Sequence, residues 1–254
     1  MYSTCPKCRR DLPAETADSA KQCPWCGVLF EKWLHANLRP DEMPVSNPAS
    51  PPKWIAAARE RVLFVPPDVD PPTFWFRVAL LVTLVVWGAS FALMDYARLH
   101  GGLPEINQSF MHRVNLAFHE AGHILFIPFG RFMSVLGGSL MQLLVPLVAV
   151  WAFLYRTRDT FAAGVGLWWV AQSALDLAPY IYDARRGQMI LLGGVTGRDR
   201  PGYHDWHNIL GDLGLLRQDH LLAGAAHAIG TLVMLTAVTW SGWILFKQFQ
   251  LLRR

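Results

Sequence analysis

Apolar residues in this 254-residue chain gather into long blocks after residue 73, whereas the earlier part of the chain is polar and rich in proline. Each block is long enough to cross a hydrocarbon core of about 30 Å as an α-helix. Lipid offers the backbone no hydrogen-bond partner, so a helix is the structure expected there. The blocks lie at 74–97, 109–128, 133–155, 161–182 and 220–246. The pattern predicts an all-α, multi-pass membrane protein with about five or six transmembrane helices, following a small N-terminal module.

The composition agrees with a domain that lies in a lipid bilayer. Hydrophobic residues make up 52% of the chain and charged residues 17%, below the quarter that is usual in soluble domains. Many of the 11 Trp residues lie near the ends of the apolar blocks, as in the aromatic belts of membrane proteins. The net charge of +4 is mild and its basic residues are dispersed, so nucleic-acid binding is not expected.

The basic residues indicate an orientation. Lys and Arg are enriched in cytoplasmic loops, and several precede the first block, which places the N-terminus in the cytoplasm. They are Lys53, Arg59, Arg61 and Arg77. With five crossings, the Arg-rich loop at 184–219 is also cytoplasmic. Arg156, Arg158 and the basic C-terminus then fall on the other side, a conflict that a sixth crossing or a re-entrant segment would remove.

The N-terminal module, residues 1–36, contains all four cysteines of the chain. Cys5 and Cys8 form one C-x-x-C pair, and Cys23 and Cys26 form a second pair 14 residues later. No apolar stretch of signal-peptide length precedes them, so we expect a reducing cytoplasm, where paired cysteines favour metal binding over disulfides. Four thiolates at this spacing predict a closed, structural Zn²⁺ site.

The pattern of the module resembles a zinc ribbon. Redox-active cysteine pairs are the alternative. A cytoplasmic protein partner or the cytoplasmic tail of a substrate is the expected ligand of the module, because its few basic residues are too sparse for nucleic acid. Nine prolines between residues 37 and 72 predict a stiff, extended linker. Within it, Trp54–Leu63 could form a short helix on the membrane surface.

The central motif is His119-Glu120-Ala121-Gly122-His123, an H-E-x-x-H sequence inside an apolar block. Residues four apart lie about 40° apart around a helix, so both imidazoles can reach one ion. Glu120 lies beside them and can take a proton from a water molecule that zinc activates. Ionisable groups inside an apolar span are costly and usually functional. A polar patch that packs helices together is the other interpretation.

A catalytic zinc needs a third protein ligand and an open fourth position. The block at 161–182 ends in two acids, Asp176 and Asp183, which are seven residues apart and hence on nearly the same helix face. Either acid is a candidate ligand. Asp183 could instead pair with a neighbouring Arg, and Asp176 could bond within the helix bundle. Pro179 between them predicts a kink.

The loop at 184–219 contains His204-Asp205-Trp206-His207. Its two histidines and its acid are accessory candidates that could ligate a metal or cap the mouth of the site. The alternative is a turn with solvated polar groups, since loops are generally polar.

Residues 109–184 resemble the site-2 protease family of intramembrane metalloproteases. Members carry H-E-x-x-H on one span and Asn-x-x-Pro, followed shortly by Asp-Gly, on a later span. The resemblance implies that His119 and His123 are zinc ligands, that Glu120 is the catalytic base and that an Asp is the third ligand. Asp176 stands where the family has Asn, and the gap to Asp183 is one residue shorter than usual. The choice between these two acids therefore stays open.

Two further features bear on the resemblance. Ala184 replaces the family's Gly, and Gly137-Gly138 resembles the short loop between the family's motif helices. The expected function is zinc-dependent hydrolysis of peptide bonds in a membrane-protein substrate within or next to the bilayer. A non-catalytic membrane scaffold or receptor, with a structural metal site and a ribbon that recruits partners, is the alternative.

Overall fold

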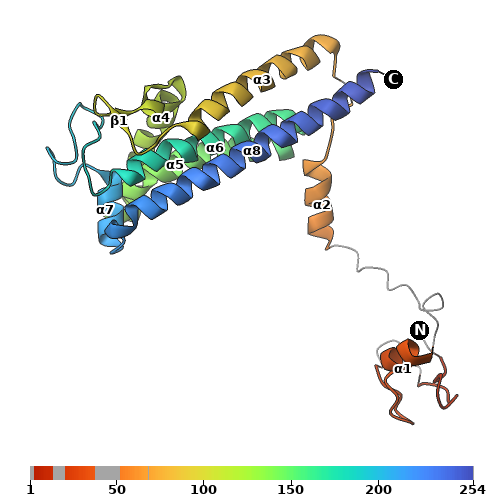
Figure 1. Cartoon of the computed structure of the whole chain (residues 1–254). Coiled ribbons are helices and arrows are strands. Elements are labelled where there is room, and N and C mark those ends of the chain that lie inside the picture. Colours follow the sequence, from red (N-terminus) through yellow and green to blue (C-terminus); the bar gives the residue numbers. More distant parts are fainter. Residues whose placement is uncertain (1–2, 14–20, 38–51, 68, 254) are drawn as a thin grey trace. The chain divides into compact units, whose positions relative to one another are not determined.

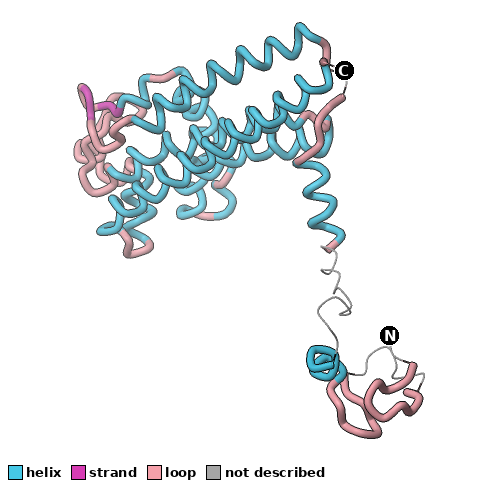
Figure 2. Tube along the Cα trace, turned by 45° about the vertical axis from the view of Figure 1, so that its right-hand side comes forward, coloured by secondary structure: helices cyan, strands magenta, loops and turns pink. Residues whose placement is uncertain are grey.

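The computed structural model describes residues 3–13, 21–37, 52–67 and 69–253. The chain divides into two compact units, Met1–Lys53 and Trp54–Arg254. Residues 38–51 of the expected proline-rich linker lie outside the described residues. Helices make up most of the second unit, and the described part of the first unit is mainly loop (Figure 2).

The first unit consists of two similar turns followed by a short helix. Each turn is closed by a single bridge between extended residues, Thr4 with Asp11 and Gln22 with Leu29. Helix α1 then runs over Phe30–Asn37. A small core joins the turns to this helix; its buried members are Cys5, Leu12, Cys23 and Phe30.

The second unit begins with α2 (Lys53–Val62), close to the expected surface helix, and α3 (Pro71–Leu93). Asp70 caps α3 by accepting a hydrogen bond of 2.7 Å from the backbone N–H of Thr73, and prolines suit the first positions of a helix. A two-residue antiparallel hairpin follows, β1 (Leu99–His100) with β2 (Leu103–Pro104). The 3₁₀ turn η1 (Glu105–Gln108) leads into the next helix.

The rest of the unit is helical. Its elements are α4 (Phe110–Leu125), η2 (Ile127–Phe129), α5 (Arg131–Ala152), the π-helical turn η3 (Phe153–Thr157), α6 (Thr160–Tyr182), α7 (Asp205–Asp212), η4 (Leu216–Gln218) and α8 (Asp219–Leu252). The long helices α3, α5, α6 and α8 run side by side (Figures 1 and 2). Helix α6 packs against each of the other three, so it forms the centre of the bundle.

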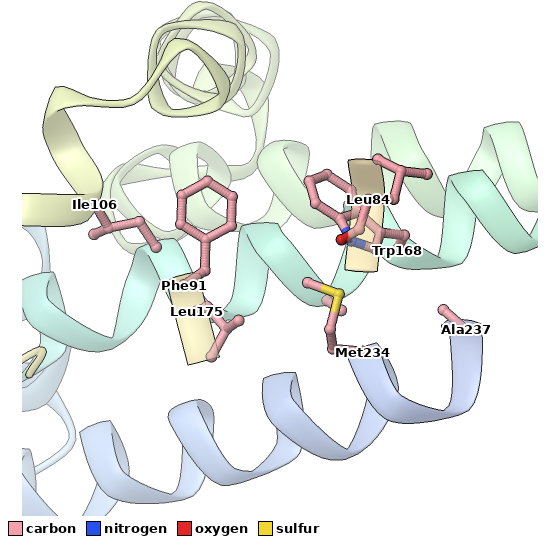
Figure 3. Close-up of a cluster of buried hydrophobic side chains, with 8 residues drawn as sticks. Leu84, Phe91, Ile106, Trp168, Leu175, Met234 and Ala237 are labelled. Atoms are coloured by element: carbon pink, nitrogen blue, oxygen red, sulfur yellow. Dashed lines mark hydrogen bonds between the residues drawn. The ribbon is translucent and has the colours of Figure 1, made fainter. Parts of the chain in front are cut away.

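The main core lies between α3, α6 and α8 (Figure 3). Phe91, Trp168, Leu175 and Met234 are at most 4% exposed. The indole N–H of Trp168 donates a 2.9 Å hydrogen bond to the backbone carbonyl of Leu84, which satisfies its polar atom inside the core. The core thus ties the central helix α6 to the helices on either side.

Three helical segments in the described chain are long and apolar enough to span a membrane: Pro71–Leu93, Arg131–Thr157 and Leu216–Leu252. Large apolar side chains are exposed along all three, for example Phe76, Val148 and Leu232. Such faces suit lipid contact. The chain is therefore a helical membrane protein with three candidate spans. Its predicted orientation, with the N-terminus in the cytoplasm, stays a prediction.

The expectation of five or six spans is wrong for two physical reasons. Helix α4 has 16 residues, which is about 24 Å and short of the roughly 30 Å of hydrocarbon. Helix α6 has 23 residues but includes Gln172, Ser173 and Asp176, all buried. An apolar block in sequence can be a helix in the centre of a bundle as well as one that faces lipid.

Candidate metal centre

Helix α4 brings the H-E-x-x-H motif together as the spacing predicts. Ser109 caps this helix by accepting a 3.1 Å hydrogen bond from the backbone N–H of His112. The rings of His119 and His123 have centroids 4.9 Å apart. One nitrogen of each ring and a carboxylate oxygen of Glu120 all lie within 4.8 Å of one another. This group can hold a metal ion.

A hydrogen bond at Nδ1 of each imidazole fixes the orientation of the ring. Nδ1 of His123 lies 2.9 Å from the carbonyl oxygen of Ser134, and Nδ1 of His119 lies 3.2 Å from Oε1 of Gln142. Both partners are acceptors, so each Nδ1 donates a hydrogen bond, and an imidazole held in this way can offer Nε2 to a metal ion. Fixing the ring through its other nitrogen is typical of metal-binding histidines.

Asp205, in the first turn of α7, supplies the acid that meets this pair. Its Oδ2 lies 3.0 Å from Nε2 of His119 and 3.3 Å from Nε2 of His123. The hydroxyl of Tyr180 donates a 2.9 Å hydrogen bond to the same oxygen and accepts one of 2.9 Å from the backbone N–H of Asp205.

The distances suit a shared cation. Two imidazole lone pairs that face a carboxylate oxygen repel it unless positive charge lies between them. Ligand atoms about 2.0–2.1 Å from a tetrahedral zinc are about 3.3 Å apart, close to the 3.0 and 3.3 Å between Oδ2 of Asp205 and the two Nε2 atoms. The donor set of two imidazoles and one carboxylate therefore fits zinc.

A missing side chain keeps the space beside the rings open. A Cβ atom on Gly138 would lie 2.6 Å from Nε2 of His119 and 2.7 Å from Nε2 of His123. The helices α4 and α5 cross closely here, since a Cβ on Gly122 would lie 2.1 Å from the carbonyl oxygen of Gly137. Both Gly137 and Gly138 lie within α5. The expectation that this pair forms an interhelical loop is wrong.

Asp176 and Asp183, the expected third ligands, lie elsewhere. Asp176 is 5% exposed and its oxygens lie 2.9 and 3.1 Å from Nδ1 of His112. Asp183 accepts backbone hydrogen bonds of 3.1 and 2.8 Å from Gln188 and Met189. It therefore holds the start of the loop that follows α6. Among the described residues, the carboxylate that contacts the imidazole pair is that of Asp205.

The other accessory candidates support α7 instead of entering the site. His204 caps α7 by accepting a 3.2 Å hydrogen bond from the backbone N–H of His207, and its ring lies 4.4 Å from that of Tyr180. His207 donates a 2.8 Å hydrogen bond through Nδ1 to the carbonyl of Ala184. Asp205 and these two histidines are close neighbours in the sequence. Only the packing of α7 determines that Asp205, and neither histidine, contacts the imidazole pair.

The metal centre opens into a cavity of about 610 Å³. Glu120, Asp205 and Tyr180 form part of its wall. Glu120 is only partly buried and makes no hydrogen bond or ion pair with a described residue, so its carboxylate is free to act on a molecule in the cavity. A cavity of this size is typical of small-ligand sites.

The four cysteines of the first unit form a second metal-binding group. Sγ of Cys5 lies 3.7 Å from that of Cys26, and Sγ of Cys8 lies 3.8 Å from that of Cys23. A tetrahedral zinc with Zn–S bonds of about 2.3 Å places its sulfurs about 3.8 Å apart, whereas a disulfide needs about 2.05 Å. All four cysteines are free thiols that can hold a metal. No family model, curated protein or solved structure matches this chain.

Proposed function

We propose that this protein is a zinc-dependent endopeptidase that cleaves membrane-protein segments within or next to the bilayer. One observation supports this most directly. Two imidazoles, each fixed through Nδ1, converge with one carboxylate at the wall of a cavity, while Glu120 makes no hydrogen bond or ion pair with any residue that the structure describes. Hydrolytic zinc sites have this composition, with three protein ligands and an open position for water.

Each residue has a defined part in this proposal. His119, His123 and Asp205 would hold the ion, which when bound supplies Lewis-acid activation of a water molecule. Glu120 accepts a proton from the attacking water as the C–O bond forms, and gives a proton to the amine nitrogen as the C–N bond breaks. Tyr180 positions Asp205 through its two hydrogen bonds with that residue.

A non-catalytic scaffold with a metal site is the alternative, and it would be favoured by a fourth protein ligand. The ring of His204 accepts a hydrogen bond from the backbone of α7, and the ring of His207 donates one to the backbone carbonyl of Ala184. Neither histidine therefore serves as a fourth ligand. Glu120 is the remaining candidate, and its free carboxylate beside the cavity suits a base better than a structural ligand. The arrangement therefore supports the enzyme. For the cysteine group we propose a structural zinc whose module binds a protein partner.

Metal content and proteolysis together test the proposal. The purified full-length chain in detergent is expected to contain two zinc ions, and Asp205→Ala is expected to contain one. Asp183→Ala is the matched control and should keep two. Glu120→Gln should also keep both ions but cleave fluorescein-labelled casein, a general unstructured substrate, about 10²–10⁴-fold more slowly. Casein cleavage by Glu120→Gln at the wild-type rate would overturn the proposed mechanism.

A further inference from the structure

The cavity has a second polar region, at the other end of the helix that carries the metal motif. His112 lies on α4 seven residues before His119, and both line the cavity. Seven residues are two helical turns, or about 10.5 Å. Leu116, one turn from either end, also lines the cavity. The wall of α4 therefore presents a polar group, an apolar group and then the metal centre.

His112 is held by a dedicated buried acid. Its Nδ1 lies 2.9 and 3.1 Å from the two oxygens of Asp176. The side-chain amides of Asn115 and Gln142 each donate a 3.2 Å hydrogen bond to Oδ2 of this acid. Three hydrogen bonds, one from each donor, fix the orientation of this carboxylate. Nδ1 of His112 is the donor to this carboxylate, and the bond fixes the orientation of the ring.

The other nitrogen of His112 is available to a ligand. None of the described residues bonds to its Nε2, and the side chain is 22% exposed. Burial lowers the pKa of His112 and the Asp176 carboxylate raises it, with a net upward direction. A protonated ring donates from Nε2 as well as from Nδ1. Asp176 is the acid that faces this ring; Glu120 and Asp205 lie at the metal end of the cavity.

Arg113 adds a second cationic donor at this end. It lines the same cavity, is exposed and forms no ion pair with any described residue. Guanidinium and imidazolium donors together match the geometry of a carboxylate. The rest of the cavity wall includes apolar side chains, among them Leu177, Leu191 and Leu192. An apolar peptide with one acid would match this lining.

We propose that His112 and Arg113 form a carboxylate-binding subsite that selects peptides with an acid about three residues beyond the cleaved bond. The spacing follows from about 10.5 Å along α4 and about 3.3 Å per residue of an extended chain. The carboxylate is either the C-terminus of the peptide or a Glu or Asp side chain. The inference rests on the proposed function, because the distance is counted from the metal centre.

Peptide hydroxamates can test the subsite without any need for cleavage, since the hydroxamate chelates the metal. The probes are succinyl hydroxamates extended by Leu-Leu with a free carboxylate or an amide end, and by Leu-Glu-amide or Leu-Gln-amide. Their binding to the full-length protein is measured by calorimetry in detergent. Each acidic probe that reaches the subsite is expected to bind about tenfold more tightly than its neutral match. The pair with the larger ratio identifies the source of the carboxylate.

Substitutions then assign the preference to the two residues. Arg113→Gln and His112→Gln are each expected to bring the ratio of acidic to neutral probe close to one. Arg113 is exposed, so its variant should fold even where His112→Gln does not. Arg217→Gln, at an exposed position outside the cavity, is the matched control and should keep the wild-type ratio.

The outcomes separate the two proposals. Equal binding of acidic and neutral probes by the wild type overturns the subsite and leaves the metal centre intact. A preference that persists in Arg113→Gln and His112→Gln also overturns it. Failure of every hydroxamate to bind counts against the metal centre, and so against the proposed function and the subsite together.

Discussion

Replacing Gly138 by Ala should remove the metal from the candidate centre. The added Cβ would lie 2.6 and 2.7 Å from the Nε2 atoms of His119 and His123, inside the 3.0 Å that real Cβ contacts do not cross. The rings cannot turn away without breaking their bonds to Gln142 and Ser134. Overpacking of this kind costs about 1–3 kcal/mol of unfolding free energy. The methyl group also fills space that an ion about 2.1 Å from each nitrogen would need.

The same substitution elsewhere in the bundle provides the control. A Cβ on Gly242 of α8 would lie 3.9 Å from Cδ2 of Leu81, and one on Gly211 of α7 would meet nothing within 4 Å. Ala is favoured over Gly inside a helix by up to about 1 kcal/mol. Gly242→Ala and Gly211→Ala should therefore leave stability unchanged or raise it. The three variants differ in what the methyl group meets, not in its chemistry.

Metal counting by mass spectrometry and thermal unfolding in detergent give the readout. The cysteine site serves as an internal standard, because Gly138 has no part in it. Gly138→Ala should fall from two zinc ions to one and unfold at a lower temperature, whereas both controls keep two. If Gly138→Ala keeps two ions bound with wild-type affinity, the space beside the imidazoles is not where the metal binds, and the ligand assignment is wrong.

The remaining predictions concern groups that support the two metal sites. Gln142→Leu removes the acceptor at one imidazole and should weaken metal binding at the candidate centre about 10–100-fold in a chelator titration; unchanged affinity would contradict this. Asp183→Asn should lower the unfolding free energy by about 1–3 kcal/mol with two ions retained, and loss of an ion would show that Asp183 is a ligand after all. Gly27 and Arg9 occupy the same place in the two cysteine turns, with φ of +70° and +57°. A positive φ strains any residue that has a Cβ atom, but not glycine. Gly27→Ala should therefore weaken zinc binding at the cysteine site by about 1 kcal/mol, and Arg9→Gly should strengthen it by a similar amount. Effects of the same sign would show that backbone strain does not control zinc binding at these turns.

The parts of both sites that lie within one local motif could be predicted from sequence. His119 and His123 share a helix face because of their spacing alone, whatever the rest of the chain does. The C-x-x-C pairs likewise form their turns locally. The acid proposed as the third metal ligand could not be predicted in this way. Asp205 reaches the imidazoles only because α7 packs against α5 and α6, and no local pattern distinguishes it from Asp176 or Asp183.

The number of spans could not be predicted for a related reason. Hydropathy reports how apolar a segment is, but it does not report what covers the segment. Helix α6 is apolar enough to look like a span by eye, yet 15 of its 23 residues are buried inside the protein. Lipid-facing helices such as α3 instead expose apolar side chains. Which side of a helix its neighbours cover is a property of the fold.

The polarity that excludes α6 from the candidate spans also builds the site. Ser173, Asp176 and Tyr180 follow one another along this helix at spacings of three and four residues, and therefore lie on one face. Asp176 and the carbonyl of Ser173 hold the amide of Gln142, whose oxygen in turn fixes His119, while Tyr180 holds Asp205. Buried polar groups are tolerated when they are hydrogen-bonded in this way. An apolar residue at Asp176 would make α6 a better span by composition but would remove an acceptor that holds Gln142, and an apolar residue at Tyr180 would remove the donor that holds Asp205.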